Sequence, residues 1–318
     1  MPRVAGTFES ENAMHASTGN GNDKHAGIFA EVLGCTRRYH VSLTAAALLI
    51  GCAALLRCWI APALQMLPDR FEVETIYRAT LQSHQRPDSE AEVTHSTVKR
   101  VEQALAAQDG HVIVQGDMHW LTDSGSVIFE TFGRYGIDRR SKRNVRGIGD
   151  QDRNGQYWFP THVEKKQYDL WDPVYAGPAD VSFDHAVNFR GLEIYVFTYR
   201  VKGLDETSGY ASLPDVPERY NAITYGEGSL WIEPLSGIVL DHEDSGISYF
   251  VDPKSGQNIG KPVNQWIARY TPETVDAQVL RAVAARHWIL ALELWLPLVL
   301  SAAGVALAAL GWLSRARP

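Results

Sequence analysis

Two long runs of apolar residues stand out in the chain, one near its start and one near its end. The first, residues 41–60, reads VSLTAAALLIGCAALLRCWI and carries a single charge, Arg57. The second, residues 288–312, reads WILALELWLPLVLSAAGVALAALGW and also carries one charge, Glu293. At ~1.5 Å per helical residue, either run covers the ~30 Å of a hydrocarbon core. We therefore predict two transmembrane helices, over residues 39–62 and 288–313.

Each run has one alternative interpretation. Ala61-Pro62-Ala63 resembles a signal-peptide cleavage site, but the polar tail before the first run and the length of the run favour a retained helix. The second run would otherwise be a buried helix of a soluble protein, which its length argues against. Arginines flank the outer ends of both runs, at 37, 38, 315 and 317. By the positive-inside rule we expect a two-pass cell-membrane protein with both termini cytoplasmic and residues 69–286 outside.

Between the two runs the pattern alternates with the period of half-buried β-strands. Turn signals such as Asp109-Gly110, Ser124-Gly125 and Ser236-Gly237 separate the alternating segments, which is typical of antiparallel hairpins. The segments that alternate are 71–81, 92–105, 111–121, 126–137, 191–201, 229–234, 238–243, 248–251 and 264–270. The pattern predicts a mainly β fold: an antiparallel β-sandwich or barrel-like extracytoplasmic domain over residues 69–270, bracketed by the two transmembrane helices.

The remaining segments complete the predicted organisation. Thr271 and Pro272 mark the start of a juxtamembrane helix over residues 271–287. Residues 139–146, RRSKRNVR, are followed by several glycines and read as a long loop. Residues 1–38 have too few large apolar side chains to offset chain entropy, so we expect a disordered cytoplasmic tail. Residues 314–318 form a second, short cytoplasmic tail.

Charge and cysteine content narrow the function classes. The net charge is −7, and residues 69–286 hold 32 acidic and 23 basic residues. This acidic body excludes the basic face that a nucleic-acid partner needs. The cysteines, at positions 35, 52 and 58, all lie outside the body. The body therefore has neither a disulfide framework nor a cysteine-ligated metal. Its stability must come from the burial of a core.

Residues 156–173, QYWFPTHVEKKQYDLWDP, resemble the FPF-x-EK-x-Y-x-YWD signature of the actinobacterial PorA family, which is largely described as a domain of unknown function. Three further segments follow the family's order: Arg57 to Pro62 with Leu67-Pro68, the strand at 191–197, and the hairpin LWIEPLSGIVLD at 230–241. His162 departs from the family, which often has an acidic residue there. The resemblance implies two membrane helices around one extracytoplasmic β-rich domain, and it implies little about activity.

The YWFP…WDP stretch has two interpretations. One is a ligand-contacting loop; the other is an aromatic plug that closes one end of the β-domain, because aromatic residues mostly bury. The candidate ligand-binding residues are Trp158, Phe159, Lys165, Lys166, Trp171 and Asp172.

The basic run at 139–146 is the second candidate site, because clustered cations attract anionic surfaces. Its alternative is an ordinary solvated loop. The candidate contacts with an anionic surface are Arg139, Arg140, Lys142, Arg143 and Arg146.

Signs of catalysis are weak. His111 and His119 would share a strand face with Asp117 near, but scattered histidines are usually ordinary polar residues. Neither the pair Asp169/Asp172 nor the run Asp241 to Asp244 is specific, and no HExxH, GxSxG, SxxK or phosphate loop occurs. We expect no enzyme, no metal and no cofactor.

The helices themselves argue against a pore. A pore-lining helix needs a polar stripe, and these hold only Arg57 and Glu293 as charges, with small residues suited to close packing. The two charges fall at similar depth, where each alone would be costly, so we predict that they pair across the helices.

The function predicted from the sequence is a membrane-anchored envelope protein whose non-enzymatic β-domain binds a lipid, a lipoglycan or another envelope-derived ligand. Its expected partners are the lipid bilayer and such a ligand. The sequence does not decide whether the protein forms a homo-oligomer. The alternatives are an oligomeric porin-like channel or a hydrolase without a recognisable motif.

Overall fold

The computed structural model describes residues 39–108, 110–150, 152–172, 177–207 and 219–316. The predicted tail at 1–38 and the arginines at 37, 38 and 317 lie outside these residues. The chain divides into two units, one formed by residues 55–296 and the other by residues 1–54 and 297–318. We describe each unit by itself.

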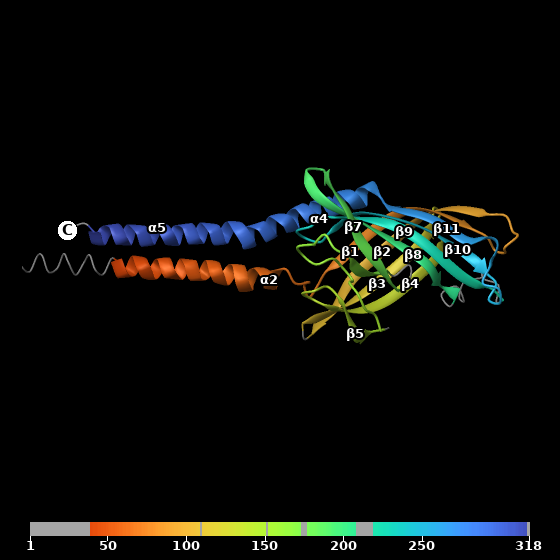
Figure 1. Cartoon of the computed structure of the whole chain (residues 1–318), viewed down its shortest axis with the longest axis horizontal. Helices are drawn as coiled ribbons and strands as arrows, with labels where there is room; N and C mark the ends of the chain where they lie inside the picture. Colours follow the sequence, from red (N-terminus) through yellow and green to blue (C-terminus); the bar gives the residue numbers. More distant parts are fainter. Residues whose placement is uncertain (1–38, 109, 151, 173–176, 208–218, 317–318) are drawn as a thin grey trace, which may run out of the picture. The chain divides into compact units, whose positions relative to one another are not determined.

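The larger unit is one antiparallel sheet, which confirms the mainly β prediction. Its strand order is β5-β4-β3-β2-β1-β11-β10-β9-β8-β7-β6. Neighbouring strands in the sheet are consecutive in the chain except β1 and β11, and β5 and β6 are the two edge strands. Figure 1 shows these strands curling around one interior. The strands are β1 (Glu72–Ser83), β2 (Glu92–Gln108), β3 (His111–Thr122), β4 (Val127–Asp138), β5 (Asn144–Gly149), β6 (Tyr168–Asp172), β7 (Gly177–Phe189), β8 (Leu192–Asp205), β9 (Asn221–Ile232), β10 (Val239–Val251) and β11 (Asn258–Tyr270).

A short segment links the two edges of this sheet. Gln156 bridges Arg143, just before β5, and Leu170 of β6. Its backbone N–H donates to Asp169 at 2.5 Å, and its carbonyl accepts from Trp171 at 2.7 Å. The sequence predicted either a β-sandwich or a barrel-like domain. A single curled sheet whose edges are linked in this way matches the barrel-like alternative.

Several strand predictions were wrong. Residues 144–149 form β5 and not a loop, and the glycines that suggested a loop adopt positive φ within and beside this short edge strand. The predicted segments at 238–243 and 248–251 are one strand, β10. Gly246 in the middle of this strand makes room for a ring, because a Cβ there would lie 2.1 Å from the side chain of Trp266. Strands β6 and β7 were not predicted: β6 has only five residues, and the register of β7 shifts between Phe183 and His185.

The core lies inside the curled sheet. Phe159, Phe197 and Ile232 are among its fully buried side chains, and Tyr77 and Trp266 pack with them. Phe159 comes from the segment between β5 and β6, so the aromatic stretch of the signature is part of the core. Each fully buried large apolar side chain contributes about 1.5–3 kcal/mol relative to exposure, which lets this unit be stable without disulfides.

Helical segments enter and leave the larger unit. The first ends in η1 (Leu56–Ile60) and α2 (Ala61–Leu64); the last contains α4 (Pro272–Leu290) and η2 (Ala291–Trp295). Thr271 caps α4 as predicted, its hydroxyl accepting from the backbone N–H of Thr274 at 3.2 Å. Both η segments are π-helical turns, which occur frequently at functional sites.

The smaller unit is a pair of apolar helices. The helices Tyr39–Leu64 and Pro272–Arg315 are long and apolar enough to span a membrane. The smaller unit contains the first helix up to Ala54. It contains the second helix from Pro297 onward, which is most of α5 (Leu296–Ala316). A Cβ at Gly304 would lie 3.0 Å from the carbonyl oxygen of Ala46, and one at Gly311 would lie 2.8 Å from Ser42. The small residues therefore let these helices pack closely.

Candidate functional site

One cavity of about 390 Å³ opens into the larger unit where its helical segments meet the β-sheet. Leu64, Met66 and Leu67 line it from the first helical segment, and Trp288, Ile289 and Leu292 line it from the last. The segment between β5 and β6, with β6 itself, contributes aromatic rings: Tyr157, Trp158, Phe159 and Trp171. The wall is thus predominantly apolar and aromatic, as is usual for small-molecule sites.

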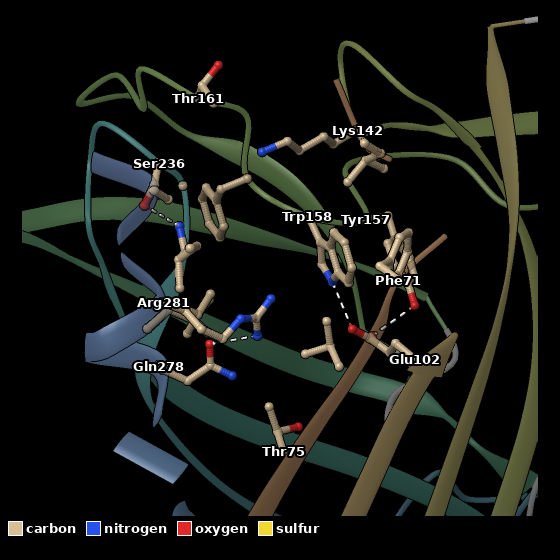
Figure 2. A pocket seen from close by; sticks show the side chains of 18 of the residues that line it. Phe71, Thr75, Glu102, Lys142, Tyr157, Trp158, Thr161, Ser236, Gln278 and Arg281 are labelled. Carbon is tan, nitrogen blue, oxygen red and sulfur yellow. Dashed lines mark hydrogen bonds between the residues drawn. The ribbon is translucent and has the colours of Figure 1, made fainter. Parts of the chain in front are cut away.

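Glu102 of β2 fixes the aromatic wall (Figure 2). Its carboxylate accepts from the Tyr157 hydroxyl at 2.9 Å and from the Trp158 indole at 3.0 Å, and it is paired with Arg100. Burial, and then the charge of Glu102, raise the pKa of Tyr157 well above its ordinary value, so the phenol stays a donor. Because both rings are held by a buried carboxylate, their positions are set before any ligand arrives.

Helix α4 is fastened over the cavity by a second buried carboxylate. Glu233, which is fully buried, accepts from the Arg286 guanidinium of α4 at 2.8 Å and from the backbone N–H of Ser236 at 2.7 Å. The turn between β9 and β10 then meets the signature segment, where a Cβ at Gly237 would lie 2.2 Å from the carbonyl oxygen of Pro160. Only glycine fits that approach at a φ of +75°. The wall formed by α4 and this turn is therefore rigid.

One part of the cavity lining is a cluster of polar side chains around His242. Tyr77 and His242 line the cavity, with the Tyr77 hydroxyl 2.9 Å from His242 Nδ1. The Tyr199 hydroxyl lies 3.1 Å from His242 Nε2 and donates to Asp244 at 2.6 Å. Burial lowers the pKa of His242 to about 4, so its ring is neutral at physiological pH. The polar groups here satisfy one another.

Lys142 reaches the cavity from the turn between β4 and β5. Its side chain is buried, with 8% of the residue exposed, and its amine has no hydrogen-bond or ion-pair partner among the described residues. Burial lowers the pKa of Lys142 to about 8. Figure 2 shows the amine extending over the space between Thr161 and Trp158. The sequence predicted a surface contact for Lys142, but its burial places it inside.

A comparison with protein families identifies the chain at this point. The family model described as Porin PorA matches residues 40–313, which covers both helices and the whole β-domain. The chain belongs to the Porin PorA family. The resemblance seen in the sequence is therefore confirmed, and the signature residues of this PorA-family chain form one wall of the cavity.

Similarity to solved structures is distant. A putative exported protein with a YmcC-like fold from Bacteroides fragilis is 11% identical; the match covers 64% of this chain and 96% of that one, with a TM-score of 0.26. A DUF1329 family protein from Desulfovibrio piger is 6% identical over 70% of this chain and 91% of that one, with a TM-score of 0.15. Comparison with curated proteins gives no match.

The predicted ligand-binding residues separate into two groups. Trp158, Phe159, Trp171 and Asp172 all line the cavity. The two lysines point elsewhere: both are exposed, Lys165 lies 4.8 Å from the Tyr195 ring centroid, and Lys166 pairs with Glu164 at 2.7 Å. This one segment contributes to both the core and the cavity: Phe159 is buried in the core and also lines the cavity, and Trp158 lines the cavity.

Two of the predicted anionic-surface residues are already paired with carboxylates. Arg139 pairs with Asp69 at 2.7 Å and Arg143 with Asp169 at 2.9 Å, so these guanidinium groups are already engaged. Arg140 and Arg146 are exposed.

The histidines considered for a metal site lie apart from the cavity on β3, where His119 is 3.3 Å from Glu130. Within the described residues there is no group of three or more histidine, cysteine, aspartate or glutamate side chains that could hold a metal ion.

Arg57 and Glu293 lie in the two π-helical turns. The Arg57 guanidinium is 3.9 Å from the Glu293 carboxylate, and this carboxylate also accepts from Gln65 at 2.6 Å and lies 3.0 Å from His162 Nε2. Sequence reasoning missed Gln65 as a partner of Glu293. His162, the position that departs from the family, holds the signature segment to η2.

Sequence reasoning missed several residues of the site. Arg100 and Glu102 lie within a correctly predicted strand, but no pattern distinguishes inward-facing charges there from outward-facing ones. Gln278 and Arg281 of α4 also line the cavity, and the Arg281 guanidinium donates to Gln278 at 3.1 Å. In the sequence, only the spacing of Gln278 and Arg281 along the predicted juxtamembrane helix could have indicated that they share one face.

Proposed function

We propose that this PorA-family protein is a non-enzymatic, membrane-anchored receptor or carrier whose β-domain binds the apolar part of an amphiphilic envelope ligand. The observation that supports the proposal is the cavity of about 390 Å³ with its aromatic wall. Its volume lies in the range of roughly 300–1,000 Å³ that is usual for ligand sites. The lower end of that range favours one acyl chain over the two chains of a phospholipid.

The position of the cavity supports a lipid source for the ligand. Its wall includes Leu64 and Leu292, which belong to helices long and apolar enough to span a membrane. With these helices in a bilayer, the cavity would lie at the membrane surface, where an acyl chain has a short path from one apolar environment to another. The proposed topology places the β-domain on the extracytoplasmic side, as the arginines at the outer chain ends favour.

The name of the matched family raises a channel as the alternative. The charged residues of the two helices support ligand binding instead. Arg57 lies 3.9 Å from Glu293, and Glu293 also contacts His162 of the β-domain, so these two charges do not form a polar stripe along a helix. Conductance of the purified protein in planar bilayers, at protein levels that saturate insertion, would favour the channel.

Quenching of tryptophan fluorescence by brominated lipids tests the proposal. Trp158, Trp171 and Trp288 line the cavity, and a bromine atom quenches an indole that it touches. The full chain in mild detergent is titrated with dibromostearic acid and with dibromostearyl alcohol. Saturable quenching by at least one of them is the expected result.

A matched pair of variants shows whether the quenching comes from the cavity. Ala285 of α4 lines it, whereas neighbouring Ala284 is exposed. Ala285→Phe should abolish the saturable component by filling the cavity, and Ala284→Phe should leave it unchanged. Linear, unsaturable quenching in the wild type, or equal quenching in both variants, would contradict the proposal.

A further inference from the structure

Lys142 is the most unusual charged group of the cavity. A buried amine is costly to keep charged, and buried lysines are normally paired. Lys142 is 8% exposed, yet no acidic or carbonyl oxygen among the described residues accepts from its amine. Among the described residues, this buried cation therefore has no counter-ion.

The backbone around Lys142 is built to hold it there. Its φ is +57°, a left-handed conformation that costs a non-glycine residue about 1–2 kcal/mol. Such strain persists only where surrounding contacts enforce it, and it is concentrated at functional sites.

Those contacts come from both sides of the turn. The Asp138 carboxylate accepts from the backbone N–H groups of Arg140 and Ser141, at 3.2 and 2.6 Å. The Lys142 carbonyl accepts from the N–H groups of Tyr157 and Trp158, at 3.0 and 3.3 Å. The turn is therefore fastened to the same segment that forms the aromatic wall.

The other charges around the cavity leave an excess of positive charge. Arg100 is paired with Glu102, and Asp172 is the other acidic side chain of the lining. Arg281 adds a cation from α4, and Figure 2 shows its guanidinium and the Lys142 amine extending into the same space. With His242 neutral, the lining holds the cations Arg100, Lys142 and Arg281 against the anions Glu102 and Asp172.

We infer that the ligand is an anionic amphiphile, and that Lys142 is the counter-ion of its head group. This inference rests on the proposed function, because it gives the chemical class of the ligand for the same cavity. The acyl chain contacts the aromatic wall, and a carboxylate or phosphate head accepts hydrogen bonds from the Lys142 amine. The head group supplies the negative charge that the described residues around the amine lack.

Three probes with equal chains test the assignment in the full protein at about pH 7, where the amine is protonated. Dibromostearyl alcohol has a neutral head, dibromostearic acid a carboxylate, and the corresponding alkyl phosphate a phosphate. The wild type should bind one or both anionic probes at least about tenfold more tightly than the alcohol, since a charge-assisted hydrogen bond is typically worth that much. Preference between the two anionic probes distinguishes a fatty acid from a phosphate source.

The variant that tests Lys142 is Lys142→Met, which keeps the aliphatic stem and the turn. It should lower the affinity for the anionic probes to that for the alcohol and leave the alcohol unchanged. Lys142→Arg, which keeps the charge, should retain the preference, and Arg140→Met, in the same turn but exposed, should bind all probes as the wild type does.

The outcomes separate the two proposals. Equal binding of the alcohol and the anionic probes by the wild type would overturn the anionic assignment and leave the proposed function standing. The assignment would also be overturned if Lys142→Met and Lys142→Arg both lost affinity for all three probes to the same extent. The lysine would then only shape the cavity. Failure of every probe to bind the wild type would refute the proposed function itself.

Discussion

Replacing Lys142 by methionine should make the ligand-free protein more stable. The pKa of Lys142 falls from its ordinary value of 10.5 to about 8 because burial disfavours the charged amine. At 1.36 kcal/mol per pH unit, this difference corresponds to roughly 3 kcal/mol of destabilisation when the amine is charged in both the folded and the unfolded chain. Methionine preserves most of the buried stem and carries no charge. Lys142→Met should therefore raise the free energy of unfolding by about 2–3 kcal/mol at neutral pH.

The sign and the pH window follow from linkage. Below pH 8 both states of the wild type are protonated and the full cost applies. Between about pH 8 and 10.5 the unfolded chain keeps its proton while the folded chain loses it, so the stability of the wild type rises with pH. The advantage of Lys142→Met should thus be largest below pH 8 and should disappear toward pH 10.5.

Urea unfolding of the full chain in mild detergent, followed by tryptophan fluorescence at several pH values, measures this difference. Arg140→Met is the control, since its side chain is exposed, and it should stay within about 0.5 kcal/mol of the wild type. A Lys142→Met variant that is less stable than the wild type at neutral pH would refute the reasoning, because the amine would then make a stabilising contact inside the fold.

Three further predictions concern binding and the buried charges. Affinity for dibromostearic acid should fall above about pH 8, because the Lys142 amine deprotonates in the free protein while the carboxylate keeps its charge; titrations of this probe from about pH 7 to 10 measure it, and a flat profile would contradict it. Glu102→Ala should lower the free energy of unfolding by about 3 kcal/mol, since it leaves the buried Arg100 guanidinium unpaired; a loss below ~1 kcal/mol in urea unfolding would count against that role. In a double-mutant cycle, Arg57→Ala and Glu293→Ala should couple, because their groups lie 3.9 Å apart and each charge alone is costly in a membrane helix; additive effects of the two substitutions would contradict the pairing.

Apolar periodicity carried most of the fold prediction. The two long apolar runs and the alternating segments of β1 to β4, β8 and β11 were recognised, whereas only the last part of β9 was predicted and β10 was predicted as two segments. Strand β7 was missed although Ala179 and Val181 alternate with polar residues. Its alternation is broken by the register shift between Phe183 and His185, while pairing with β6 and β8 holds the strand in the sheet. Pairing between distant segments of the chain leaves no local signal.

The aromatic wall could be predicted in part, and the charges around it could not. Trp158 and Trp171 stand out in the sequence because their stretch is rich in aromatic residues and matches the family signature. Lys142 stands in a run of arginines and looks like one more solvated cation. Its burial depends on the left-handed turn held by Asp138 and on the bonds from the signature segment, which only the folded chain brings together.

Native mass spectrometry of the full protein, purified in mild detergent, tests the central claim most directly, because it weighs whatever the cavity retains. We predict one single-chain anionic lipid per wild-type chain, kept by Arg140→Met, depleted in Lys142→Met and absent from Ala285→Phe. A wild-type chain without a bound lipid, or the same neutral lipid on all four proteins, would contradict the account.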